Sequence, residues 1–326
     1  MKESLPKVVV LDRGSLAPDS LDWSAWESLE ASIEYFHNTE PSELKERAQG
    51  AVALLTNKVV IPREIMSENS QLKFIGIMAT GANNVDLDAA RASDIVVSNA
   101  RDYGTESVAQ HTWMLILSLS HRLYEYQTLL KSGAWSDQPF FALLQPSKAE
   151  LTGQTLGIIG LGTLGGAVAQ KAHAFGMNVC ALESKRKSHQ NLFPDIERLS
   201  LDALLKRSDV VSLHCPLSDE NRAFMNEDTF QKMKPGALLV NTARGGLIDQ
   251  DALLNALRSG HLGGAALDTL DIEPPPRDHP LLTAELPNLL ITPHHAWGSQ
   301  RSRQTLLDQT LENLRGFLDG SAIRCL

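Results

Sequence analysis

The sequence predicts an α/β protein of two domains, each built around a parallel sheet. The chain has 326 residues, more than a single hydrophobic core usually takes. Short β-branched runs alternate with helix-like stretches, a pattern typical of parallel sheets with crossover helices. A glycine-rich turn, GIIGLGTLGG, lies almost at the midpoint, so a whole domain precedes it. We expect one domain to comprise residues 1–100 together with 299–326, and the other to comprise residues 101–298.

The first part of the chain predicts a smaller, flavodoxin-like parallel α/β domain. Its expected strands are residues 7–11, 32–36, 51–56, 72–78 and 95–98. Helix-like segments such as residues 41–49 separate these strands. A single long helix is expected from about residue 106 to 131, followed by a loop that contains Pro139 and Pro146.

The second part predicts a doubly wound Rossmann sheet. Six strands are expected, at residues 155–159, 178–182, 209–213, 237–240, 264–267 and 289–292, with helices between them such as residues 201–206 and 251–259. The last segment, residues 303–318, spaces four leucines along one helical face and could return to the first domain.

The glycine-rich turn predicts a dinucleotide site. Gly160, Gly162 and Gly165 follow an apolar strand and precede a helix that ends near Phe175. In that context the first glycine makes the tight turn, the second lets the backbone approach a pyrophosphate, and the third lets the helix pack on the strand. Glu183 ends the next apolar run, where a carboxylate can hydrogen-bond the adenosine ribose. The spacing alone would be weak evidence, but these features in register favour a functional site.

The composition argues against several other classes of function. A net charge of −9 disfavours nucleic acid as a partner, and we interpret the one basic cluster, residues 185–187, as a solvated loop. The three cysteines, Cys180, Cys215 and Cys325, have no metal-ligand spacing, so we expect reduced thiols in the cytoplasm and no metal. No apolar run is long enough for a secretion signal or a membrane span.

Three side chains with catalytic potential follow expected strands of the second domain, where ligands bind in open α/β sheets. Arg244 precedes two glycines and could bind a carboxylate through a bidentate ion pair. His294 could exchange a proton near neutral pH, and Glu273 could orient its imidazole. Taken alone, the arginine could be a surface residue, the histidine a structural one and the glutamate a solvated turn residue. The neighbouring His295 also leaves the choice of histidine open on chemical grounds.

Taken together, these residues resemble a known family along nearly the whole chain. The stretches that carry the resemblance are TGANNVDLDAA from Thr80, YGTESVAQH from Tyr103, LGIIGLGTLGG from Leu156, LHCPLS from Leu213, NTARGGLIDQDAL from Asn241, GAALDTLDIEPP from Gly264 and TPHHAWGS from Thr292. They are similar to those of D-isomer-specific 2-hydroxyacid dehydrogenases, which transfer a hydride between NAD(H) and a 2-hydroxy or 2-oxo acid. The resemblance implies that Arg244, Glu273 and His294 form the catalytic set, and it selects His294 over His295.

The resemblance also implies the binding residues. The substrate carboxylate would be held by Thr80, Gly81, Ala82 and Arg244, with Asn57 and Lys58 nearby. The cofactor would be contacted by Thr105, Gly160, Gly162, Thr163, Leu164, Gly165, Glu183, Cys215, Pro216, Thr242, Ala243, Arg244, Asp268 and His294. Asp268 would reach the nicotinamide amide, although that residue by itself favours a turn-capping role.

The motifs TNK, TGANNVD, SVAQH and HxAW resemble those of the glycerate dehydrogenase and hydroxypyruvate reductase branch. We therefore expect D-glycerate and hydroxypyruvate as substrates, with glyoxylate as a further candidate. Two positions depart from the family: Thr163 stands where arginine is common, and His295 where an aliphatic residue is usual. Glu183 favours NAD because it would repel a 2′-phosphate, whereas the basic residues after Ser184 could accept NADP.

Other functions remain open on sequence grounds. One alternative is an NAD(H)-sensing binding protein, as in the related transcriptional corepressors. Another is a relative that oxidises formate or phosphite, or reduces a bulkier 2-oxo acid. By resemblance we expect a homodimer formed through the second domain, by the helix after Tyr103 and the loop that carries Trp135, although Trp135 could instead be a buried anchor of its own subunit. We also expect the two domains to close over the substrate.

Overall fold

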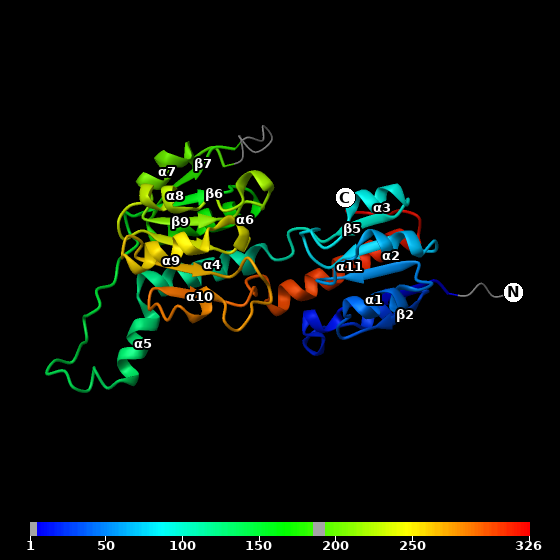
Figure 1. Ribbon diagram of the computed structural model, residues 1–326, viewed down its shortest axis with the longest axis horizontal. Coiled ribbons are helices and arrows are strands. Elements are labelled where there is room, and N and C mark those ends of the chain that lie inside the picture. Colours follow the sequence, from blue (N-terminus) through cyan, green and yellow to red (C-terminus); the bar gives the residue numbers. More distant parts are fainter. Residues whose placement is uncertain (1–4, 185–192) are drawn as a thin grey trace. The chain divides into compact units, whose positions relative to one another are not determined.

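The computed structural model describes residues 5–184 and 193–326, which form two compact units (Figure 1). The first unit comprises Met1–Gly104 and Gly298–Leu326, and the second comprises Thr105–Trp297. The basic cluster at residues 185–187 lies outside the described residues. In the part of the chain that is described, no helix is both long and apolar enough to cross a membrane.

The first unit contains a five-stranded sheet with the order β2-β1-β3-β4-β5, in which every pair of neighbouring strands is parallel. This is the strand order of flavodoxin-like folds, and it confirms the predicted class. The strands are β1 (Lys7–Val10), β2 (Ser32–Tyr35), β3 (Ala53–Thr56), β4 (Phe74–Ile77) and β5 (Val96–Asn99). Strands β3 and β4 are buried along their whole length because helices cover both faces of the sheet.

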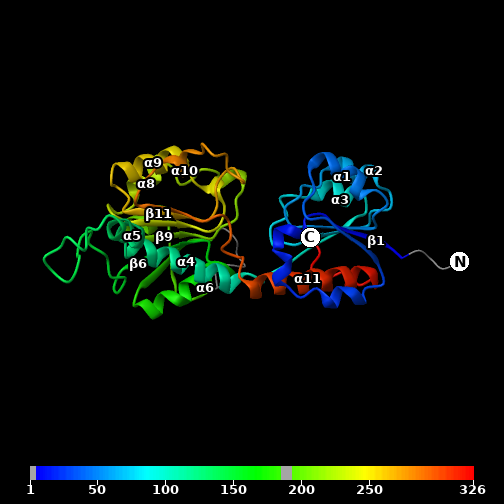
Figure 2. The same cartoon turned by 90° about the horizontal axis from the view of Figure 1, so that it is seen from below.

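One face of this sheet is covered by α1 (Pro41–Ala48), α2 (Arg63–Glu68) and α3 (Leu87–Ala92), and the other by α11 (Gln300–Leu318) (Figure 2). Short 3-10 helices at Arg13–Leu16, Pro18–Ser20 and Ser24–Ser28 follow β1. The C-terminal helix does return to this unit: Phe317 stacks on Phe74 of β4 with ring centroids 4.7 Å apart, and Asn313 Nδ2 donates to the Asn99 carbonyl at 2.9 Å.

The second unit contains a seven-stranded parallel sheet with the order β12-β11-β10-β9-β6-β7-β8. Its strands are β6 (Thr155–Ile159), β7 (Asn178–Leu182), β8 (Glu197–Leu199), β9 (Val210–Leu213), β10 (Leu238–Asn241), β11 (Gly264–Leu267) and β12 (Leu289–Ile291). The order reverses at β6, as in a Rossmann sheet, which confirms the fold. The sequence predicted six of these strands. It missed β8 because that strand has only three residues, two of them charged.

Helices cover both faces of this sheet. Helices α4 (Thr105–Ser120) and α6 (Thr163–Ala172) pack on one face, whereas α8 (Glu227–Lys232) and α9 (Gln250–Arg258) lie on the other (Figure 2). Among the described residues of this unit, the other helices are α5 (Leu123–Lys131), α7 (Leu201–Arg207), α10 (Pro280–Thr283) and 3-10 helices at His173–Phe175, Asp219–Asn221 and Gly245–Leu247.

The expectation of one long helix over residues 106–131 is wrong, because the structure has two helices there. Helix α4 ends at Ser120, and α5 begins at Leu123 after a break at Arg122. Arg122 has a left-handed backbone with φ of 51°, which ends an α-helix. Neither proline nor glycine marks the break, so the sequence carried no signal for it.

Candidate active site

The residues singled out in the second unit follow six neighbouring strands at one edge of the sheet. His294, Glu273 and Arg244 lie in the connections after β12, β11 and β10, three adjacent strands. The turn that begins at Gly160 and the residues Glu183 and Cys215 follow β6, β7 and β9. Because all these strands are parallel, the six connections lie at the same carboxyl edge, where ligands bind in open α/β sheets.

A short hydrogen bond joins His294 to Glu273. The distance from His294 Nδ1 to Glu273 Oε2 is 2.6 Å, and the two side chains are 29% and 32% exposed. The other carboxylate oxygen of Glu273 accepts from the Leu270 backbone N–H at 2.9 Å. Since the carboxylate accepts a hydrogen bond from Nδ1, the second ring nitrogen of His294, Nε2, is left to act on a ligand.

Arg244 lies at a turn that glycine makes possible. Asn241 holds this turn, because its Nδ2 donates to the Arg244 carbonyl at 2.8 Å and its Oδ1 accepts from Ala243 N–H at 3.0 Å. A Cβ added to Gly245 would overlap the backbone of Leu270. Glycine therefore lets the arginine turn pack directly on the turn that carries Glu273. The Arg244 side chain is exposed, and its Nη1 donates to the Ala243 carbonyl at 2.7 Å.

Asp268 caps the segment that carries His294. Its side chain is 1% exposed, and its Oδ1 accepts from the Thr292 hydroxyl at 2.6 Å and from the His295 N–H at 3.1 Å. Its Oδ2 accepts from the Ala296 N–H at 2.9 Å, and its carbonyl accepts from the His294 N–H at 2.8 Å. These bonds hold His294 in a left-handed conformation with φ of 50°. In this structure the Asp268 side chain caps the turn. A contact of Asp268 with the nicotinamide amide stays a prediction.

His111 contacts the residues that hold the His294 segment, although the sequence predicted no role for it. Its Nε2 lies 3.0 Å from Thr292 Oγ1 and 3.5 Å from Asp268 Oδ1, and its ring meets the ring of His295 edge-on at 4.8 Å. Burial lowers the pKa of His111, the Asp268 carboxylate opposes that effect, and His295 adds to it. His111 lies in the motif that begins at Tyr103. Its role could not be predicted, because tertiary packing determines which face of α4 lies against the end of β12.

The glycine turn after β6 leaves space at the start of α6. Gly160 has φ of 103°, and a Cβ there would lie 2.5 Å from the Cys215 backbone nitrogen. A Cβ on Gly165 would overlap the Gly160 carbonyl oxygen, so both positions require glycine. A Cβ on Gly162 would meet nothing within 4 Å. Since no side chain caps this end of the ten-residue helix α6, its first N–H groups suit a phosphate.

The other candidate cofactor residues lie around this turn. Thr163 and Leu164 form the first turn of α6, Glu183 is exposed directly after β7, and Thr105 begins α4. The hydroxyl of Thr242 is buried against that of Thr112, at 3.1 Å, so a ligand would meet the backbone of Thr242.

Burial sets the charge of two residues at the end of β9. It raises the pKa of the Cys215 thiol to about 11, so at neutral pH this residue is a neutral thiol and not a nucleophile. It also lowers the pKa of His214 to about 4, so that imidazole is neutral. Cys215 and Pro216 therefore offer a ligand an uncharged wall.

The candidate substrate residues of the first unit are held in two neighbouring loops. Asn57 and Lys58 follow β3, and Thr80, Gly81 and Ala82 follow β4. Asn57 Nδ2 donates to the Met78 carbonyl, and Asn99 Nδ2 donates to the Thr80 carbonyl at 2.7 Å. Within the described residues, the buried Oδ1 of Asn57 has no hydrogen-bond partner.

Asp12 fixes the first of these loops and was missed from the sequence. Its carboxylate is 2% exposed and accepts from the backbone N–H groups of Asn57, Lys58 and Val59. Burial raises the pKa of Asp12, and the three backbone donors oppose that effect. Asp12 directly follows the first predicted strand, so the strand-end rule that selected Arg244 could have selected it too.

Comparison with known proteins gives matches across the chain. A family model described as D-isomer specific 2-hydroxyacid dehydrogenase, NAD binding domain, matches residues 113–296. A hydroxypyruvate reductase from Blautia hydrogenotrophica is 38% identical over 97% of this chain and 98% of that protein. A glycerate dehydrogenase from Methylorubrum extorquens is 37% identical over 96% of each chain. The crystal structure of the TT0316 protein from Thermus thermophilus is similar with a TM-score of 0.84 and 37% identity, and the match covers 97% of this chain and 98% of that chain. The similarity therefore includes both units.

Proposed function

The chain belongs to the D-isomer specific 2-hydroxyacid dehydrogenases, and on that premise we propose that it interconverts hydroxypyruvate and D-glycerate with NAD(H). Membership confirms the resemblance read from the sequence and makes the protein an NAD-dependent oxidoreductase. The names of the two relatives, a hydroxypyruvate reductase and a glycerate dehydrogenase, support this substrate pair. The observation that carries the proposal is the hydrogen bond between His294 and Glu273 beside the Arg244 turn, on the same sheet edge as the glycine turn.

The residues of the glycine turn fit NAD. The open space beside Gly162 admits a pyrophosphate, and the N-terminus of α6 favours its charge. Glu183, exposed directly after β7, can accept from the ribose hydroxyls and would repel a 2′-phosphate. When bound, NAD(H) supplies or accepts the hydride.

We assign proton transfer to His294. In the direction of reduction, the protonated imidazole donates from Nε2 to the 2-oxo oxygen while Nδ1–H stays bonded to Glu273. The carboxylate of Glu273 fixes the orientation of the ring through its bond to Nδ1. In oxidation the neutral imidazole accepts the proton of the 2-hydroxyl group. Such a general acid and base contributes about 10²–10⁴-fold to the rate.

We assign recognition of the substrate carboxylate to Arg244. A guanidinium has five donors, and Arg244 is exposed, with Nη1 bonded to the Ala243 carbonyl. Two parallel N–H bonds from this group would hold a carboxylate and polarise the adjacent carbonyl. In the first unit, we propose the backbone at Thr80, Gly81 and Ala82 as substrate-binding positions. The orphan Oδ1 of Asn57 supports a role in binding, because a buried acceptor without a donor is costly.

We also propose that the chain is a cytoplasmic homodimer. An apolar groove of about 1280 Å³ lies on the second unit, and Met114, Leu123, Tyr124 and Leu282 line it. Trp135 is 51% exposed and Phe141 is 94% exposed in the loop after α5. The alternative that Trp135 is buried in its own subunit is therefore wrong, and its exposure supports an intermolecular role. Three free cysteines support a reducing compartment.

A substrate panel tests the proposed function. Hydroxypyruvate, glyoxylate, pyruvate and a branched 2-oxo acid are assayed with NADH and with NADPH, and the configuration of the product is determined by chiral chromatography. We expect the highest kcat/KM with hydroxypyruvate and NADH, and D-glycerate as the product. A preference for another 2-oxo acid, or turnover of only formate or phosphite in parallel assays with NAD+, would replace the substrate assignment. Tight NADH binding without any turnover would favour the NAD(H)-sensing alternative.

A further inference from the structure

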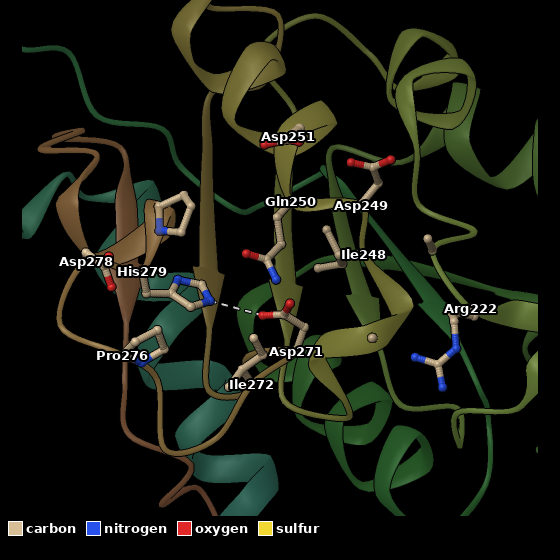
Figure 3. Close-up of a pocket in the computed structure, with 13 residues that line it drawn as sticks. Arg222, Ile248, Asp249, Gln250, Asp251, Asp271, Ile272, Pro276, Asp278 and His279 are labelled. Carbon is tan, nitrogen blue, oxygen red and sulfur yellow. Dashed lines mark hydrogen bonds and ion pairs between the residues drawn. The ribbon is translucent and has the colours of Figure 1, made fainter.

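A second histidine and carboxylate pair supports the turn that carries Glu273. His279 Nε2 lies 3.0 Å from Asp271 Oδ1, and Figure 3 shows the two side chains meeting at the wall of a pocket of about 610 Å³. The His279 side chain is 3% exposed, whereas that of Asp271 is 39% exposed. A buried imidazole thus holds a carboxylate that lies two residues before Glu273.

The ring of His279 is fixed at both nitrogens. Its Nδ1 accepts from the Leu281 backbone N–H at 3.3 Å, at the start of α10. Because Nδ1 is an acceptor, the proton of the neutral ring is on Nε2 and is donated to Asp271. Partial burial raises the pKa of Asp271, but hydrogen bonds from His279, Gln250 and the Ile272 backbone, together with the electrostatic effect of His279, outweigh it and lower the pKa. Asp271 is therefore a carboxylate at neutral pH and a strong acceptor.

The short turn from Leu270 to Glu273 is also held by contacts of its own backbone. Glu273 is about a third exposed, so burial does not determine its orientation. Its Oε1 accepts from the Leu270 N–H, which closes the turn on itself. The backbone of Leu270 and Asp271 also packs against Gly245, next to Arg244. A fixed Asp271 consequently restrains the turn that presents Glu273 Oε2 to His294.

We propose that His279, acting through Asp271, is a positioning residue that holds Glu273 in hydrogen-bonding distance of His294 Nδ1. His279 does not touch the substrate in this proposal. It acts as the outer member of a series, His279 to Asp271 to the Glu273 turn to His294, and its kinetic consequence rests on the proposed function. Such outer partners set the geometry of the groups that react.

The test uses four variants of the full chain. His279→Leu removes both ring nitrogens, whereas His279→Gln keeps an N–H donor for Asp271. Asp271→Ala breaks the pair at its more exposed member, so its effect is measurable even where His279→Leu lowers stability. Glu273→Gln identifies the Nδ1–H resonance of His294, because that downfield proton signal in 15N-labelled protein should be lost with the carboxylate.

In His279→Leu and Asp271→Ala, we expect the downfield resonance to weaken or disappear and kcat for hydroxypyruvate to fall about tenfold, with the KM for NADH within twofold of the wild type. His279→Gln should restore both readouts. In the Glu273→Gln background, His279→Leu should lower kcat by less than a further twofold, because coupled residues are not additive. A merely structural role would not give this selective rescue.

Two results would overturn the proposal: an unchanged resonance in both His279→Leu and Asp271→Ala, or full additivity with Glu273→Gln. The resonance requires no turnover, so it separates this proposal from the proposed function. Loss of the resonance in a protein that reduces no 2-oxo acid would uphold the positioning role and refute the substrate assignment. If the wild type reduces hydroxypyruvate and the resonance is intact in both His279→Leu and Asp271→Ala, the substrate assignment is upheld and the positioning role is refuted.

Discussion

Two alanine substitutions in the glycine turn should separate stability from cofactor binding. At Gly165 a Cβ would overlap the Gly160 carbonyl oxygen and lie 3.0 Å from Ile158 Cγ2, so α6 must shift from β6. Such overpacking costs about 1–3 kcal/mol, which for a domain of this size lowers Tm by roughly 2–12 °C. At Gly162 a Cβ would meet no atom within 4 Å, and φ of −101° suits alanine, so stability should change by less than about 0.5 kcal/mol.

The cofactor should separate the two variants. In Gly162→Ala the added methyl group occupies space that the pyrophosphate needs, so we expect the Kd for NADH to rise at least tenfold, or about 1.4 kcal/mol. Calorimetry measures Tm without ligand, and titration calorimetry measures Kd, so each variant serves as the control for the other. Wild-type NADH affinity in Gly162→Ala would refute the assignment of this turn to the cofactor. Wild-type Tm in Gly165→Ala would refute the packing argument.

Three further predictions concern pH, cofactor choice and assembly. The pKa of His214 is about 4 in the folded protein and 6.5 in a free chain. Above pH 6.5 the group is neutral in both states. As the pH falls from 6.5 towards 4, the unfolded chain binds the proton first, so the free energy of unfolding decreases. Between pH 7 and 5 urea unfolding should show a loss of about 2 kcal/mol that is absent from His214→Gln, and equal pH slopes would contradict this. Glu183→Ala should reduce the preference for NADH over NADPH at least tenfold in kcat/KM, and an unchanged ratio would exclude a contact with the ribose. Sedimentation should show a dimer that Leu282→Asp in the apolar groove dissociates, whereas a wild-type monomer would refute the proposed assembly.

The sequence was most informative where local chemistry is repetitive. Buried parallel strands require continuous apolar runs, so the runs at residues 51–56 and 209–213 predicted β3 and β9 directly. The glycine turn was predictable because backbone sterics, independent of the rest of the fold, demand glycine at Gly160 and Gly165. The half-exposed strand β8 offered neither signal.

The supporting residues of the site were harder to predict because their partners are distant in sequence. Asp12 contacts a loop that begins at Asn57, and His111 contacts Thr292. Neither pairing has a periodicity or spacing that could reveal it, since each depends on which helix face or strand end the fold brings near. His279 follows Asp271 closely in the sequence, but the 3.0 Å contact between the two side chains depends on the conformation of the loop that joins them.

In the proposed reaction, the imidazole of His294, oriented by Glu273, transfers the proton while NAD(H) exchanges the hydride. The most direct test compares hydroxypyruvate reduction by the wild type and by His294→Gln at one pH, with NADH affinity measured by titration calorimetry on the same samples. We predict that kcat falls by about 10²–10⁴-fold while the Kd for NADH stays within twofold. Reduction at the wild-type rate in His294→Gln would contradict the account.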